Sequence, residues 1–97
     1  MPIYIGLYNL TDQGIKNIKE SPARIEEGIK AAEAMGAKNI SFYCVMGGYD
    51  YVAIGEFPND QAAMTFALAV GSRGNVRTTT LKAFTKDEYA GAVKKLP

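Results

Sequence analysis

The chain of 97 residues contains no histidine, and this absence removes several kinds of site. A Ser-His-Asp triad, a zinc or haem ligated by histidine, and a histidine proton relay all require an imidazole group. Cysteine is almost absent as well. Because Cys44 is the single cysteine, neither an internal disulfide nor a cysteine-rich metal site can form. We therefore expect no metal and no cofactor.

An excess of charge of one sign is also lacking, with 11 Lys and Arg against 10 Asp and Glu. Nucleic acids and anionic membranes bind clustered positive charge, so we expect neither as a partner. The longest apolar run, 62–70, is interrupted by Thr65 and is far shorter than the roughly 20 residues that span a bilayer. The first residues do not resemble a signal peptide. The sequence thus predicts a cytoplasmic protein.

What the sequence does contain is typical of one small globular domain covering residues 1–97. Hydrophobic residues make up 47% and charged residues 22% of the chain. Hydrophobic periodicity predicts the elements. Strands are expected at 3–10, 39–46, 51–57 and 75–84, and helices at 12–36, 60–71 and 85–96.

Three local features refine this prediction. Pro22 cannot donate its backbone hydrogen bond inside a helix, so the first helical segment should break near Ser21. The helix at 60–71 is so apolar that most of its circumference should be buried. In the strand at 75–84, Leu81 and Ala83 fall on the opposite face from Val76 and Phe84, which indicates a bulge.

The element order, with a hairpin in the middle, is βαββαβ. Right-handed crossovers then place both crossover helices on one face of a four-stranded antiparallel sheet. The expected architecture is an α+β ferredoxin-like fold.

Alternation along the strands assigns their residues to two faces, of which the helices should cover one. The predicted covered face comprises Ile3, Ile5, Leu7, Ile40, Phe42, Cys44, Val52 and Ile54. The predicted open face comprises Tyr4, Gly6, Tyr8, Ser41, Tyr43, Val45, Tyr51, Ala53, Gly55 and Phe57. Five of these ten are aromatic and none is charged, which is unlike a sheet face in water.

An uncharged aromatic face is typical of an interface core and would promote aggregation if it stayed exposed. We therefore expect a homodimer or higher homo-oligomer in which a second copy packs sheet against sheet. The small residues Gly6, Ala53 and Gly55 should leave a hollow on this face, suited to a small hydrophobic ligand between the sheets. Its expected rim consists of Tyr8, Tyr43 and Tyr51.

Several motifs together resemble the GYD domain family over nearly the whole chain. They are Phe42-Tyr43, Gly48-Tyr49-Asp50, Gly74-Asn75-Val76-Arg77-Thr78 and Thr80-Leu81-Lys82-Ala83-Phe84, with Lys82 where arginine is expected. The resemblance implies the dimeric α/β-barrel superfamily, which includes cofactor-free oxygenases, isomerases and haem enzymes. No activity of the GYD branch itself carries over, and histidine-ligated haem chemistry is excluded by composition.

Candidate site residues each have a second interpretation. Tyr49 and Asp50 could share a proton at a pocket mouth, but turn hydrogen bonding is the favoured role. Arg73 and Arg77 could bind an anion, although pairing with Glu56 or Asp50 is favoured.

The remaining candidates concern the sheet. Tyr8, Tyr43 and Tyr51 could hold a flat aromatic ligand or simply pack at an interface, and both interpretations stay open. Glu56 could serve as a base if an apolar pocket raised its pKa, although a salt bridge at the rim is favoured. Cys44, expected among helix-facing apolar residues, should be inert.

Two functions follow as hypotheses. The first is a homo-oligomeric binding module that holds a small hydrophobic ligand, with Tyr8, Tyr43, Tyr49, Tyr51 and Arg77 as contacts. The alternative is a cofactor-independent enzyme, resembling an oxygenase or isomerase, that acts on a small aromatic or polyketide-like substrate. Its candidate catalytic residues are Tyr43, Asp50 and Glu56.

Overall fold

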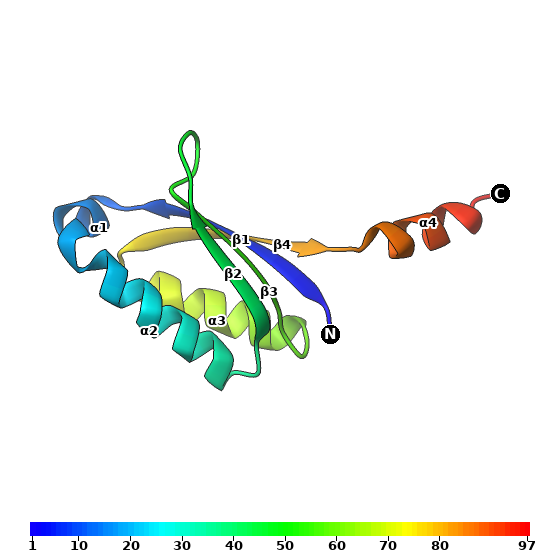
Figure 1. The fold of residues 1–97 in the computed structure, drawn as a ribbon, viewed down its shortest axis with the longest axis horizontal. Coiled ribbons are helices and arrows are strands. Elements are labelled where there is room, and N and C mark those ends of the chain that lie inside the picture. Colours follow the sequence, from blue (N-terminus) through cyan, green and yellow to red (C-terminus); the bar gives the residue numbers. More distant parts are fainter.

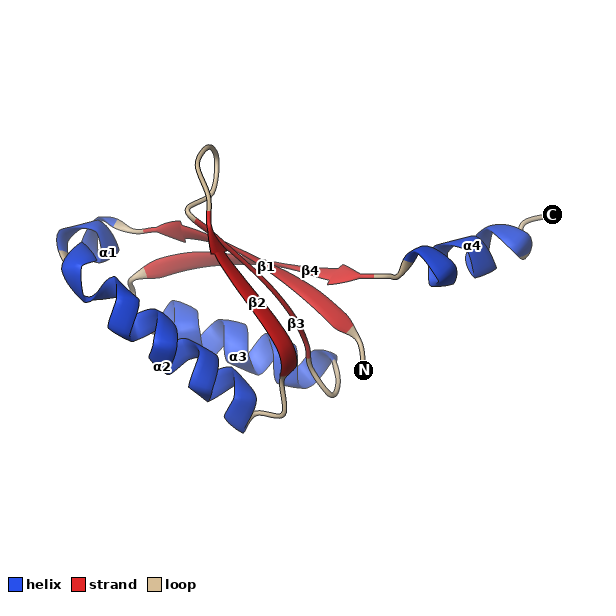
Figure 2. Cartoon of the chain, in the orientation of Figure 1, coloured by secondary structure: helices blue, strands red, loops and turns tan.

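The computed structural model describes all residues, 1–97, and confirms the ferredoxin-like α+β fold. The chain forms β1 (Ile3–Leu10), α1 (Asp12–Lys16), the 3₁₀ turn η1 (Ile18–Glu20), α2 (Ser21–Ala34), β2 (Lys38–Cys44), β3 (Tyr51–Glu56), α3 (Asp60–Ser72), β4 (Val76–Ala83) and α4 (Lys86–Lys94). The antiparallel sheet has the order β2-β3-β1-β4. Helices α2 and α3 lie under one face of the sheet, whereas the other face has no helix on it (Figures 1 and 2).

Local sequence signals explain where the helices begin and end. Pro22 occupies the first turn of α2, so the predicted break separates α1 and η1 from α2. Gly36 has a φ of 93°, a conformation that glycine adopts without strain, and it ends the segment after α2. Asn59 caps α3 by accepting a hydrogen bond from the Ala62 amide. No helix is both long and apolar enough to cross a membrane.

The predicted facing of β1 and β3 is wrong, because the two faces of these strands are exchanged. Tyr4 and Phe57 are buried with Ala32 of α2 and Ala63 of α3, so the aromatic side of these strands faces the helices. Both faces are apolar, so alternation separates two sets of residues without indicating which set the helices cover. The Tyr4 hydroxyl also finds a partner in Asp60, which removes the cost of burying it.

Strand β2 has the predicted orientation, with Ile40 and Phe42 towards the helices and Tyr43 on the other face. Cys44, however, is exposed rather than buried. The predicted bulge in β4 is absent, because every residue from Val76 to Ala83 pairs with β1. The irregularity lies in β2 instead, where the register shifts between Lys38 and Ser41.

The core of the isolated chain is small, with seven of 97 residues buried. Its aromatic centre is Phe57, whose ring lies 5.9 Å from the ring of Tyr4 and 5.5 Å from that of Phe66. The expectation that α3 is buried around most of its circumference is wrong, since Met64 and Leu68 are 57% and 66% exposed. A large share of the apolar surface therefore remains available for contacts beyond this chain.

A polar contact joins the start of α3 to the sheet. The Tyr4 hydroxyl donates a hydrogen bond to Asp60, whose carboxylate also lies 3.0 Å from the Lys82 ammonium. Burial, together with the hydrogen bond to Asp60 and its negative charge, raises the pKa of Tyr4 from 10.0 to about 12. The Tyr4 hydrogen bond and Lys82 lower the pKa of Asp60. Lys82 thus holds a charge contact although it replaces the expected arginine.

This contact predicts a stability loss in alkali. The folded chain favours the neutral Tyr4 phenol, so its contribution is fully present below pH 10 and is lost as the pH rises towards about 12. In urea unfolding at pH 8 and pH 11, the wild type should lose more stability than Tyr4→Phe. Other tyrosines contribute equally to both proteins. Equal losses would contradict the assignment.

Candidate functional site

The candidate site is a cavity of about 190 Å³ between the sheet and the helix layer. Its sheet side includes the small residues Gly6, Ala53 and Gly55, and its helix side includes Gly28 and Ala32. The Tyr8 ring lies against Gly6 and Ile40 lies against Gly55, whereas Gly28 has open space beside it. The sequence predicted a hollow on the open face, whereas this cavity lies on the helix side of the sheet.

Gly28 shows most directly how the cavity arises. It lies in the interior of α2, where glycine is less favourable than alanine by roughly 1 kcal/mol. A Cβ atom built at Gly28 would meet no other atom within 4 Å. The missing side chain therefore leaves open space on the cavity side of α2.

Tyr8 provides a polar group in the cavity. A Cβ atom at Gly6 would lie 2.7 Å from the Tyr8 hydroxyl and 2.9 Å from its ring, so the Tyr8 ring folds back across Gly6. Only a residue without a side chain permits this position. Burial raises the pKa of Tyr8, with no contribution from a hydrogen bond or charge. The phenol thus stays protonated at neutral pH and can donate a hydrogen bond to a ligand.

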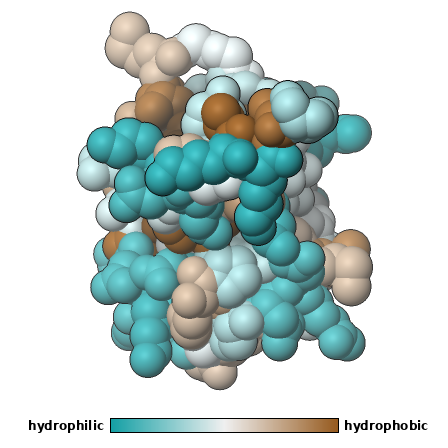
Figure 3. Space-filling model, turned by 90° about the vertical axis from the view of Figure 1, so that its right-hand side faces the viewer, coloured by the Kyte–Doolittle hydropathy of each residue, from teal (hydrophilic) through white to brown (hydrophobic).

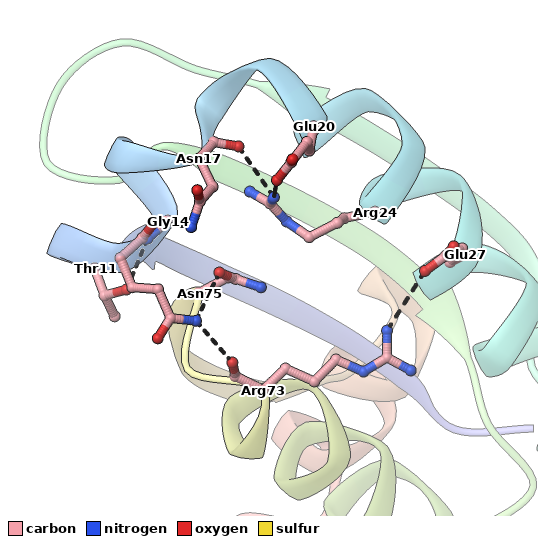
Figure 4. Close-up of polar contacts among 9 residues, drawn as sticks. Thr11, Gly14, Asn17, Glu20, Arg24, Glu27, Arg73 and Asn75 are labelled. Carbon is pink, nitrogen blue, oxygen red and sulfur yellow. Dashed lines mark hydrogen bonds and ion pairs between the residues drawn. The ribbon is translucent and has the colours of Figure 1, made fainter.

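Two arginines among the lining residues form the charged rim of the cavity. Figure 4 shows the polar contacts of both. A guanidinium nitrogen of Arg24 lies 3.1 Å from the Asn17 carbonyl oxygen and 3.6 Å from the Glu20 carboxylate. A guanidinium nitrogen of Arg73 lies 3.8 Å from the Glu27 carboxylate. Because these carboxylates are exposed and loosely paired, each arginine can exchange its partner for an anionic group on a ligand.

The loop carrying Arg73 is fixed to the start of α1. The Gln13 amide donates hydrogen bonds of 3.0 Å to the Arg73 carbonyl and to the Asn75 side chain. Thr11 reaches the same loop, since its hydroxyl donates to the Gly74 carbonyl at 2.5 Å and accepts from the Gly14 amide. The rim is therefore held by several side chains.

The structure brings together some of the predicted site residues and separates others. Tyr8 and Tyr51 line the cavity, where the Tyr51 ring lies 5.3 Å from that of Phe42. Tyr43 does not belong to the rim, because it projects from the opposite face of the sheet. The remaining predicted residues lie outside the cavity; they are Tyr49, Asp50, Glu56 and Arg77.

Two predicted pairings are replaced by others. Arg73 pairs with Glu27 rather than with Glu56 or Asp50. Glu56 accepts a hydrogen bond of 2.6 Å from the Asn39 amide on the neighbouring strand. Sequence reasoning missed Arg24 and Gly28, although a glycine in the middle of an amphipathic helix is a signal that something packs or binds there.

Asp50 has a clear structural role at the end of the hairpin. Its carboxylate accepts a hydrogen bond of 2.8 Å from the Leu10 amide, and its own amide donates one of 2.9 Å to the Tyr8 carbonyl. The Asn9 side chain also donates to the Gly48 carbonyl at 3.0 Å. These bonds tie the β2–β3 turn to the end of β1, beside Tyr8.

This role predicts different effects for two substitutions of Asp50. Asp50→Ala leaves the half-buried Leu10 amide without its acceptor and should lower the free energy of unfolding by about 1–3 kcal/mol. Asp50→Asn keeps an acceptor oxygen and should lose less than half of that amount. Urea denaturation measures both. Equal losses would show that the carboxylate charge, and not the hydrogen bond, is what matters.

Comparison with known proteins places these features in a family. Residues 4–93 match the GYD domain. The chain belongs to the GYD domain family. A curated relative from Thermus thermophilus, named "Glutamine synthetase and cystathionine beta-lyase binding protein", is 36% identical over 95 residues, which cover 97% of this chain and 100% of that protein. The Gly48-Tyr49-Asp50 tripeptide of this GYD domain forms the turn whose last residue, Asp50, accepts the hydrogen bond from the Leu10 amide of β1.

A solved structure supports the fold. The crystal structure of At3g17210 from Arabidopsis thaliana superposes with a TM-score of 0.56, covering 89% of this chain and 96% of that one. Its sequence identity of 16% restricts the similarity to the fold. For the GYD domain described here, the candidate site must therefore be argued from its own residues.

Proposed function

We propose that this GYD domain is a binding protein that works as a homo-oligomer and holds a small hydrophobic ligand, with an acidic group, in the cavity between its sheet and helices. The observation that carries the proposal is the combination of an uncovered apolar surface and an unfilled apolar cavity. One is the open face of the sheet, and the other is the cavity. Each is suited to a contact and neither contains a reactive cluster.

The open face supports the oligomer even though its residues differ from those predicted. Register pairs Ile5 with Ile54 and Leu81 in one row across the sheet, and Leu7 with Val52 in the next. The charged residues of this face, Lys38, Glu56 and Arg77, belong to the end rows. An aliphatic centre with polar ends is the usual composition of an interface between protein chains. A second copy of the sheet offers a matching surface.

The cavity supports the ligand. Apolar cavities of about 150 Å³ bind molecules such as benzene, and a space of about 190 Å³ suits one or two fused rings. Tyr8 offers a hydroxyl inside, and Arg24 and Arg73 offer positive charge at the rim. This arrangement favours a small aromatic acid over a neutral ring of the same size.

The relative's name adds support for a protein partner. The Thermus thermophilus protein is named for binding two enzymes. A binding role for this chain agrees with that name. The enzyme alternative has weaker support, because Asp50 and Glu56, the carboxylates that would exchange protons, lie outside the cavity that contains Tyr8.

The interface predicts the effect of a charge in the centre of the open face. Ile54→Lys would place an unpaired charge in the contact, so the assembly should dissociate at micromolar concentration. Light scattering reports the change in particle mass. Ile15→Lys, at an exposed apolar position on α1, is the matched control and should leave the mass unchanged. An unchanged mass for Ile54→Lys would remove this face from the interface.

The cavity predicts which ligands bind and which substitution blocks them. Isothermal titration should show 2-naphthoate binding at least tenfold more tightly than 2-naphthalenemethanol, because only the acid can pair with the rim arginines. Gly28→Leu fills the space and should abolish binding without loss of stability. Ala34→Leu, on an exposed position of the same helix, should bind like the wild type. Binding that survives in Gly28→Leu would contradict the cavity as the site.

A further inference from the structure

The C-terminal arm, residues 84–96, leaves the body of the domain. Helix α4 projects beyond the end of β4 and lies away from α2 and α3 (Figure 1). The arm accounts for the elongated shape of the chain, which measures 53 × 30 × 19 Å along its principal axes. Hydrophilic side chains dominate this end of the molecule, and apolar side chains gather in its upper part (Figure 3).

Helix α4 is well formed but has an unpartnered apolar stripe. Tyr89 and Val93, four positions apart, lie on one side of the helix, and Leu96 extends the stripe just past the end of α4; Tyr89 and Leu96 are each 69% exposed. A helix of nine residues is marginal in water on its own, because tertiary packing supplies most helical stability. The stripe therefore needs a surface on which to pack.

The connection to β4 keeps the arm away from its own body. Thr85 and Glu88 form a capping box, in which the Thr85 amide donates to the Glu88 carboxylate at 2.9 Å and the Glu88 amide donates to the Thr85 hydroxyl at 3.1 Å. These bonds hold Thr85 extended, with φ −68° and ψ 162°. The link contains no glycine. Folding α4 back onto its own domain would need a full reversal at Phe84 or loss of the cap.

A groove with an apolar wall runs between α3 and the edge strand β4, and its lining also includes the Asp60–Lys82 ion pair. The exposed side chains of Met64 and Leu68 form one wall, Thr78 and Thr80 line the strand side, and the space measures about 550 Å³. Helix α3 has 13 residues and α4 has nine, so their lengths are about 20 Å and about 14 Å. The stripe of α4 can lie along α3 over its whole length.

We propose that the arm of one copy docks in the α3–β4 groove of a second copy, and that the two copies exchange arms reciprocally. The occupant is a second copy because the capped link directs α4 outward and the proposed homo-oligomer already places a neighbouring chain on the open sheet face. The inference rests on the proposed homo-oligomer and extends its interface. Exchange of an identical element is a common route to symmetric dimers.

Disulfide crosslinking between single-cysteine variants tests this arrangement. In a Cys44→Ser background, a Leu68→Cys chain is mixed with a Val93→Cys chain under mild oxidation. Any mixed disulfide must then join two chains. We expect a crosslinked dimer on a non-reducing gel, identified by its disulfide-linked peptides. Replacing Val93→Cys by Lys94→Cys, which lies about 100° further around α4 and outside the apolar stripe, should reduce its yield at least tenfold.

Other outcomes would overturn the proposal. A chain that carries both Leu68→Cys and Val93→Cys and crosslinks only within itself would show that the arm folds back. Absence of the mixed disulfide would exclude this groove, and equal yields from Val93→Cys and Lys94→Cys would reveal random collisions. Sedimentation of the unoxidised mixture distinguishes failure of the arm exchange from failure of the homo-oligomer. A dimer without the crosslink removes the arm exchange alone, whereas a monomer removes the proposed homo-oligomer too.

Discussion

The structure depends on one constraint, which is that a sheet with two apolar faces has a single layer of helices. Helices α2 and α3 cover the side that carries Tyr4 and Phe57, and no element of the chain covers the other side. Burying apolar surface is the main driving force of folding, so an uncovered aliphatic face represents stabilisation that one chain cannot obtain. The small core and the projecting arm also leave apolar side chains exposed, and a second copy could bury them.

The covered face is incomplete in a different way. Between the sheet and α2, Gly6 allows the Tyr8 ring to fold across the strand, and Gly28 leaves a space that no side chain fills. Filling such a space would ordinarily increase stability, because lost contacts around a cavity are costly. An apolar cavity that contains a protonated phenol and has arginines at its rim therefore suggests that a ligand completes the core. The GYD turn contributes indirectly, because Asp50 holds the end of β1 beside Tyr8.

The element order, the break before Pro22 and the ferredoxin-like topology could be predicted from periodicity and punctuation residues, because these depend on local chemistry. The facing of β1 and β3 could not. Ile5 and Tyr4 are both apolar enough to be buried, and the choice between them depends on the distant Asp60, which accepts the Tyr4 hydroxyl. The sequence placed Gly6, Ala53 and Gly55 around a hollow on the open face. Because the facing of β1 and β3 was wrong, these residues line a cavity on the helix side instead. Arg24 and Arg73 line the same cavity only because α2 and the loop after α3 lie close together in the fold, which no local pattern indicates.

The most direct test of the account is the mass of the unmodified chain in solution, measured by sedimentation equilibrium across a range of concentrations. The account predicts an assembled species at micromolar concentration, with a mass that is a multiple of 10.5 kDa. A species of 10.5 kDa that persists at the highest concentrations reached would contradict it. In that case the aliphatic face would be stable in water, and the proposed homo-oligomer would have no basis.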